Sequence, residues 1–419
     1  MYWCFEFVKP DRVSFRGRVA KGLLGAALGM CLLGSLEGSL EAQGQGGTQD
    51  FPQDPELQKL LQEAGQEAEQ GMAETKTAKG GPGWLTAFNP RITAFGDFVF
   101  HYADDQILDD NGDNVANRFS LREAELDMRA DIDPYAKGVL ILAFGEESPG
   151  QYVTEVEEAY ATFETLPYDL RLKIGKFRPW IGLDNRLHTH DLPYTDRPLV
   201  TREFFGDEGW SDTGMNLDWL TSLGDASSLT LGYTILNGEG TQILAGGVST
   251  KPSHLARAEY FTEVGTASFI QAGASLLAGP SDADGGTTRL WGADFLYKWR
   301  PEQRRDLHSL VFQGQGYYLD RDISGQKVQS TGGSSNLLWQ FDQNWYLGVR
   351  GDYTEFADQD SGHVWGASAW LSYYSSEFLR VRVGIEHTDD PRVLPDTQAF
   401  LQLTFVMGSH PTEPYWVNR

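Results

Sequence analysis

Cysteine, long apolar runs and positive charge are all scarce in this chain of 419 residues. The two cysteines, Cys4 and Cys31, precede a candidate cleavage point after Ala42, so a mature chain would have neither disulfides nor thiolate metal sites. No stretch reaches the roughly 20 apolar residues of a membrane-spanning helix. Lysine and arginine number 34 against 59 aspartates and glutamates, and the formal net charge of −25 argues against a nucleic-acid partner.

The N-terminal segment has the pattern of an exported protein. Basic residues precede the apolar stretch 22–33, a combination typical of a secretory signal peptide, which we assign to residues 1–42. Residues 43–88 predict a periplasmic linker with a short N-terminal helix from Pro55 to about Lys76.

One unit recurs from residue 89 to residue 408: a strand with apolar side chains at every second position, a short turn, another such strand and a longer polar loop. Strands of about nine to eleven residues suit a tilted crossing of a bilayer, whereas soluble sandwiches use strands of about five or six. The expected strands are residues 92–103, 119–133, 138–145, 153–165, 169–178, 212–222, 228–236, 254–264, 267–278, 288–299, 307–319, 328–341, 345–356, 363–375, 379–388 and 397–407. The pattern predicts an all-β fold, a sixteen-stranded antiparallel transmembrane β-barrel with short periplasmic turns and long extracellular loops, ending in a C-terminal tail, 409–419.

Charged residues in these strands fall on the face opposite the apolar residues, as in 123–133. A charge that faces hydrocarbon costs several kcal/mol, so this face is expected to point into the lumen. The predicted pore-lining residues are Glu123, Glu125, Asp127, Arg129, Asp131, Arg171, Lys173, Arg350, Arg380 and Arg382. Two interpretations stay open: a transverse field that orients polar solutes, or mutual compensation of the charges.

The third outer connection, residues 181–210, is longer than the other connections expected between strands, and loops of this length are usually functional. Folded inward, it would narrow the pore and set a size limit. The charged residues expected in such a constriction loop are Asp184, Arg186, Asp196, Arg197 and Arg202.

The segment 172–199 resembles the strand-to-loop signature of the phosphate-selective porin O and P family. Residues 175–177 (GKF) and 182–184 (GLD) are similar to its two most specific elements, and Tyr194 and Arg197 are similar to an aromatic residue and an arginine farther along the loop. The resemblance implies a sixteen-stranded outer-membrane porin, often trimeric, whose third loop constricts the lumen. It does not carry phosphate selectivity to this chain, because that would require a strongly basic lumen.

His188 and His190 lie two residues apart in this loop, near Asp184 and Asp191. Alternate residues of an extended segment point the same way, so both imidazoles could reach one metal ion; the alternative is that they are ordinary polar loop residues. No nucleophile with a base in reach stands out, so we expect no enzyme and no cofactor.

These features together predict a porin in the outer membrane of a Gram-negative-type bacterium. The expected function is passive diffusion of small hydrophilic solutes or ions, with weak selectivity that favours cations. The alternative is an outer-membrane uptake channel or receptor for a metal or an anion such as phosphate. The expected partners are outer-membrane lipid, the solutes and further copies of the chain in a trimer.

Overall fold

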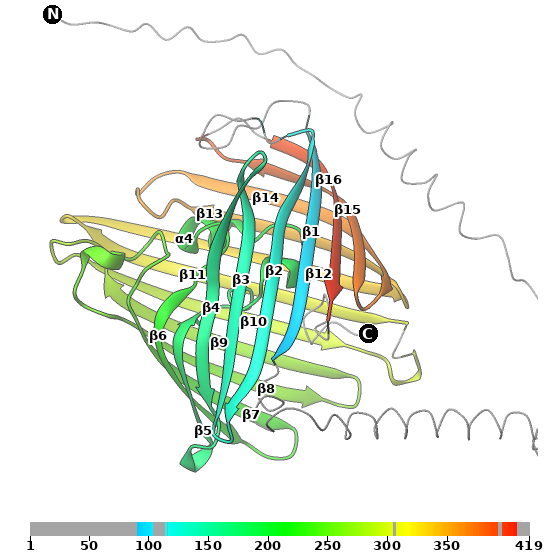
Figure 1. The fold of residues 1–419 in the computed structure, drawn as a ribbon. Coiled ribbons are helices and arrows are strands. Elements are labelled where there is room, and N and C mark those ends of the chain that lie inside the picture. Colours follow the sequence, from blue (N-terminus) through cyan, green and yellow to red (C-terminus); the bar gives the residue numbers. More distant parts are fainter. Residues whose placement is uncertain (1–89, 104–113, 115, 305–306, 393–395, 409–419) are drawn as a thin grey trace, which may run out of the picture. The chain divides into compact units, whose positions relative to one another are not determined.

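The computed structural model describes residues 90–103, 114, 116–304, 307–392 and 396–408, and these form a closed barrel of sixteen antiparallel strands (Figure 1). Each strand pairs with its neighbours in sequence, and β1 pairs with β16 to close the ring. The strands are β1 (Arg91–Ala103), β2 (Arg118–Asp133), β3 (Ala136–Ser148), β4 (Gln151–Phe163), β5 (Leu170–Phe177), β6 (Asp212–Ser222), β7 (Ser227–Leu236), β8 (Ser253–Val264), β9 (Ser268–Pro280), β10 (Thr287–Trp299), β11 (Ser309–Ile323), β12 (Gln326–Asp342), β13 (Trp345–Glu355), β14 (His363–Ser376), β15 (Leu379–Asp389) and β16 (Asp396–Met407). The predicted fold is confirmed, and most strand ends lie within two residues of the expected positions.

Helical structure in the described part of the chain is short and lies between strands. One α-helix, α4 (Leu199–Phe205), and four 3-10 turns are present: η1 (Pro167–Asp169), η2 (Thr189–Asp191), η3 (Gly246–Val248) and η4 (Glu302–Arg304). Among the described residues, no helix has the length and apolar character needed to cross a membrane. The predicted signal peptide, linker helix and C-terminal tail lie outside the described residues.

The alternation of side chains separates an apolar outer face from an inner face that carries the charges. In β13, Leu347, Val349 and Tyr353 are exposed on the outside, whereas Arg350 and Asp352 are buried inside. Because successive side chains of a strand point to opposite faces, this pattern fixes the pairing register around the ring. The outer surface is therefore the apolar band that lipid requires.

Two kinds of departure from this alternation shape the interior. A β-bulge in β4 places Val156 and Glu158 opposite the consecutive residues Leu142 and Ile141, so that both Glu157 and Glu158 are buried. The inner face also carries apolar side chains from several strands where the alternation leads us to expect polar ones. These are Leu255, Leu277, Leu290 and Leu319.

Candidate functional site

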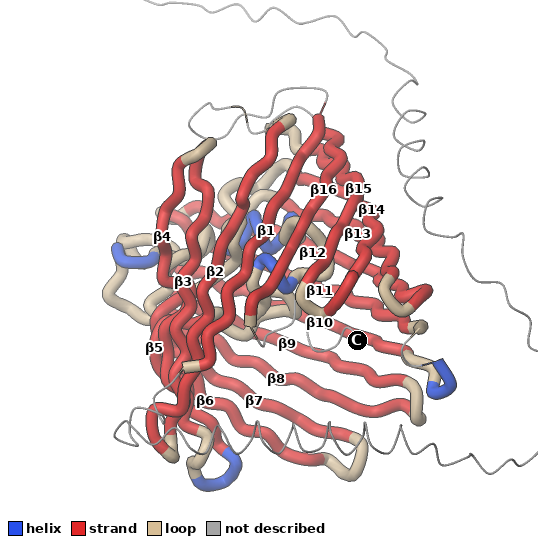
Figure 2. Tube along the Cα trace, turned by 45° about the vertical axis from the view of Figure 1, so that its right-hand side comes forward, coloured by secondary structure: helices blue, strands red, loops and turns tan. Residues whose placement is uncertain are grey.

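The connection between β5 and β6, residues 178–211, folds against the inner face of the barrel. It contains η2 and α4, which lie within the ring of strands in Figures 1 and 2. Ile181, Leu192 and Trp210 have no exposed surface. We call this connection the inserted loop.

An apolar cluster holds the second half of the inserted loop. Val200 and Phe204 of α4 pack with Trp210 against the inward leucines of β8–β11 and against Tyr317 of β11. Ile243 and Leu244, from the connection between β7 and β8, belong to the same cluster. The inward leucines are thus explained: they face protein rather than water, and their burial against the loop is favourable by about 25 cal/mol per Å² of apolar area.

The GLD segment of the loop, 182–184, makes a close contact with β11. Gly182 has φ +63°, and a Cβ on it would lie 1.9 Å from the Tyr317 hydroxyl oxygen. The Leu183 amide donates to Gln315 Oε1 over 3.1 Å, and Gln315 Nε2 donates to Asp184 Oδ2 over 2.6 Å. Burial raises the pKa of Asp184. A glycine is required here because the backbone is left-handed and Tyr317 fills the space of a side chain.

The basic side chains of β13 and β15 bind the first half of the loop through its backbone carbonyls. Arg380 donates to the carbonyl oxygen of His190 over 3.0 Å, and both Arg380 and Arg382 donate to that of Leu192, over 3.3 and 3.1 Å. Arg350 donates to the carbonyl of Asp196. These three predicted pore-lining residues are therefore buried against the loop.

Acidic side chains face the same loop segment from β2 and β4. Glu123 and Glu125 project inward from β2, and the bulge turns Glu157 and Glu158 inward from β4. His188 Nδ1 lies 2.6 Å from Glu157 Oε2 and 3.1 Å from Glu125 Oε2. Burial alone would lower the pKa of His188, but the carboxylates of Glu125 and Glu157 outweigh that effect and raise the pKa well above its usual value.

His190 lies beside His188 and completes this cluster. The two imidazole rings are stacked, with centroids 5.7 Å apart and planes at 18°. His190 Nδ1 lies 3.4 Å from Glu125 Oε2, and its ring stacks on Phe95 of β1 at 3.8 Å. Both Nδ1 atoms thus lie beside Glu125, and the carboxylates next to them come from β2 and β4. Asp184 binds Gln315 instead, and Asp191 Oδ1 lies 3.5 Å from His190 Nε2.

The other predicted lumen residues form local ion pairs, pack on an aromatic ring or face solvent. Asp127 is buried and bound by Arg129 at 2.7 Å. Arg171 pairs with Asp218 of β6 at 2.8 Å, and the Lys173 ammonium lies 4.2 Å from the centre of the Tyr160 ring.

The remaining charged residues predicted in the constriction loop each contact a specific partner. They are Arg186, Asp196, Arg197 and Arg202. Arg186 is exposed, with its guanidinium 4.2 Å from the Trp180 ring centre. Asp196 pairs with Arg122 of β2 at 3.1 Å. Arg197 is buried and donates to the carbonyl oxygens of Asp184 and Leu187, and Arg202 pairs with Asp207 at 2.9 Å.

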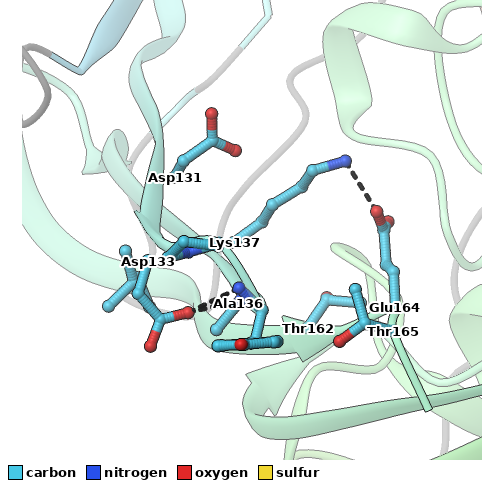
Figure 3. A pocket seen from close by; sticks show the side chains of 10 residues that line it. Asp131, Asp133, Ala136, Lys137, Thr162, Glu164 and Thr165 are labelled. Atoms are coloured by element: carbon cyan, nitrogen blue, oxygen red, sulfur yellow. Dashed lines mark hydrogen bonds and ion pairs between the residues drawn. The ribbon is translucent and has the colours of Figure 1, made fainter.

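An open pocket of about 680 Å³ lies away from the inserted loop, around the turn between β2 and β3 (Figure 3). The predicted lumen residue Asp131 is exposed and lines it. Lys137 and Glu164 form an ion pair of 2.6 Å across one side of the pocket, and Asp133 accepts hydrogen bonds from the amides of Tyr135 and Ala136. Asp133 therefore stabilises the turn, and the Lys137–Glu164 pair joins β3 to the segment after β4.

Comparison with known proteins supports the fold. No family model matches the chain, so the resemblance to the phosphate-selective porin O and P family is not confirmed at the level of the family. An uncharacterized protein of Aquifex aeolicus is 27% identical over 349 residues, 72% of this chain and 71% of that protein.

Solved structures with a similar fold are outer-membrane channels. They include the outer-membrane channel DcaP of Acinetobacter baumannii, with TM-score 0.53 and 11% identity, covering 76% of this chain and 97% of that one. An anion-selective porin from Comamonas acidovorans has TM-score 0.52 and 10% identity, covering 76% and 99%. At this identity the likeness concerns the fold. The closed barrel with its apolar outer surface belongs to the outer membrane.

Proposed function

We propose that this chain is a porin-like channel for passive diffusion of small hydrophilic solutes or ions, in which the inserted loop narrows the lumen. The observation that carries the proposal is that loop residues are bonded to inner-face side chains of β2, β4, β11, β13 and β15. A segment held from several sides of a barrel obstructs part of its cross-section. The remaining passage would set the size limit for solutes.

The charges around the loop favour weak ion selectivity. Carboxylates lie on the β2–β4 side of the loop and guanidinium groups on its β13–β15 side, all of them buried, so a solute beside the loop is exposed to a field from both signs and not to the groups themselves. Much of this charge is compensated locally, as in the Arg350–Asp352 pair at 2.7 Å. The overall acid excess favours cations over anions, so phosphate selectivity is not proposed. The resemblance noted above supports a homotrimer as the functional form.

The test compares the native channel with one in which residues 186–203 are replaced by a short Gly-Ser linker. Planar-bilayer recordings should give a larger single-channel conductance for the variant, because the obstruction is removed. Reversal potentials in a salt gradient should show only a small cation preference for the native protein. A matched control replaces the exposed turn residues 283–285 with Gly-Ser and should leave conductance unchanged.

Equal conductance of the native and loop-replaced proteins would place the loop outside the conduction path. A native protein that folds in detergent but never conducts would refute the channel itself. A clear preference for phosphate over chloride would favour the alternative function of anion uptake.

A further inference from the structure

The histidine–carboxylate cluster between the inserted loop and the β2–β4 wall has the composition of a transition-metal site. The cluster contains two groups of three residues, and within each group the ligand atoms lie within 4.8 Å of one another. Glu123, Glu125 and His190 form one group, and Glu125, Glu157 and His188 form the other. Imidazole nitrogen and carboxylate oxygen are the donors that bind divalent zinc and its neighbours in the first transition row. Calcium and magnesium, in contrast, prefer oxygen donors alone.

The spacing of the donor atoms suits an ion held by His188 together with Glu125 and Glu157. Zinc bonds of about 2.0–2.1 Å in a tetrahedron separate adjacent donors by about 3.3–3.5 Å. Glu125 Oε2 lies 3.1 Å from His188 Nδ1 and 3.4 Å from His190 Nδ1. The closer approach of His188 Nδ1 to Glu157, 2.6 Å, is a hydrogen bond in which a proton occupies the place a cation would take. Glu125 is therefore the donor that the two groups share.

The second nitrogen of each ring faces another carboxylate, which is how metal-binding histidines are usually oriented. His188 Nε2 lies 3.8 Å from Glu158 Oε2, and His190 Nε2 lies 3.5 Å from Asp191 Oδ1. Stacking on Phe95 fixes the plane of the His190 ring. Both Nδ1 atoms are thus directed to the same side, toward Glu125.

The cluster also carries more negative charge than its protein partners compensate. Arg178 bonds to Glu157, and its backbone amide donates to Glu158 over 2.7 Å. Glu123 is 7% exposed, and within the described part of the chain its Oε1 accepts no hydrogen bond, lying 3.8 Å from His190 Nδ1. Buried carboxylates are costly unless they are paired or coordinate a metal. A divalent cation would supply the missing positive charge.

We propose that Glu125, Glu157 and His188 bind one divalent transition-metal cation of the zinc class. The ion would join the inserted loop to β2 and β4, because its ligands come from all three segments. This binding does not depend on the channel function proposed above.

The test uses the whole chain, refolded in detergent without a histidine tag, stripped with a chelator, and with Cys4 and Cys31 replaced by serine. Calorimetric titration with zinc chloride should show one ion per chain, with release of protons as the ion displaces the one between His188 and Glu157. Cobalt(II) should bind at the same place and give the intense visible absorption of a tetrahedral site. Calcium should not compete.

Matched variants separate the site from the rest of the protein. His188→Gln and Glu125→Gln should abolish zinc binding, and Glu158→Gln, at the carboxylate beside His188 Nε2, should weaken it by roughly 10–100-fold. The control His254→Gln changes an exposed histidine that contacts Tyr233 and should bind zinc as the native chain does. Heat-modified gel mobility shows whether each variant has folded.

Three results would overturn the proposal. They are no zinc binding by the folded native chain, undiminished binding by folded His188→Gln and Glu125→Gln, or calcium binding as tight as that of zinc. Two ions per chain would overturn the single shared site. None of these readouts measures conductance, so this proposal can fail while the channel function stands.

Discussion

The arginines of β15 offer the sharpest test of what holds the inserted loop inside the barrel. Arg380 and Arg382 have no exposed surface, and together they donate three hydrogen bonds to the carbonyls of His190 and Leu192. Replacing both with glutamine removes the guanidinium groups while keeping a polar side chain. The shorter amide does not span the same distance, so we expect the loop segment around Leu192 to detach more often from β15.

The size of the effect follows from these three bonds. A hydrogen bond to a charged group contributes about 1.5–3 kcal/mol, and we take the lower value because carbonyls released from the wall regain water. Three such bonds give roughly 4–5 kcal/mol, which corresponds to about a 10³-fold larger population of the detached loop. The apolar cluster around Phe204 and Trp210 is untouched, so detachment should remain local.

Thiol labelling measures this detachment directly. Thr195 is buried, and its backbone carbonyl accepts a hydrogen bond from Arg122. A Thr195→Cys variant, in a chain whose Cys4 and Cys31 are replaced by serine, should react slowly with a maleimide. The Arg380→Gln, Arg382→Gln background should accelerate the reaction by up to about 10³-fold, and bilayer recordings should show higher and noisier conductance.

The control is Arg171→Gln, which removes the same charge from an inner-face arginine whose ion pair is with Asp218. It should change neither the labelling rate nor the noise. Labelling of the folded double variant at the native rate would refute the reasoning, because the arginines would then not hold the loop.

Two further predictions test the outer face and the loop contact. Leu347→Arg, on the exposed outer face of β13, should lower the free energy of unfolding in lipid vesicles by about 2–4 kcal/mol, measured by urea titration, whereas Leu347→Phe should not; equal stability of both variants would mean that the faces are assigned wrongly. Gly182→Ala should destabilise the loop, because a left-handed backbone costs about 1–2 kcal/mol for a residue with a side chain, and because the new Cβ would lie 1.9 Å from the Tyr317 hydroxyl. Tyr317→Phe should restore only the second part of that loss, and full recovery would show that the backbone is not strained.

The barrel could be predicted from sequence because the membrane imposes one rule on every strand. Lipid on the outside makes alternate residues apolar, so strands such as 212–222 were locatable to the residue. The rule makes no prediction for inner-face residues that contact protein instead of water. Leu255, Leu277 and Leu319 look like breaks in the pattern until the inserted loop is in place against them. Tyr374 is a similar case: its position near a strand end suggests an interfacial aromatic, yet it is buried inside with Trp370.

The histidine–carboxylate cluster could be predicted only in part, for a related reason. The spacing of His188 and His190 indicates that the rings share a direction, and they do stack. Their carboxylate partners lie on strands far away in sequence, and the loop's path across the interior decides which strands it meets. One signal was present at Glu157-Glu158, since two adjacent carboxylates in a strand require a bulge if neither is to face lipid.

The charges on the inner face therefore have two different roles, which a count of charged residues does not separate. Arg380 and Arg382 donate hydrogen bonds to backbone carbonyls of the inserted loop. Replacing them therefore changes the position of the loop as well as the electrostatic field that acts on a solute. Asp131, exposed at the far end of β2, makes no such contact with the loop, and its replacement acts on the field alone. Selectivity changes in the arginine variants consequently have to be separated from changes in conductance, whereas a selectivity change in Asp131→Asn at constant conductance would be purely electrostatic.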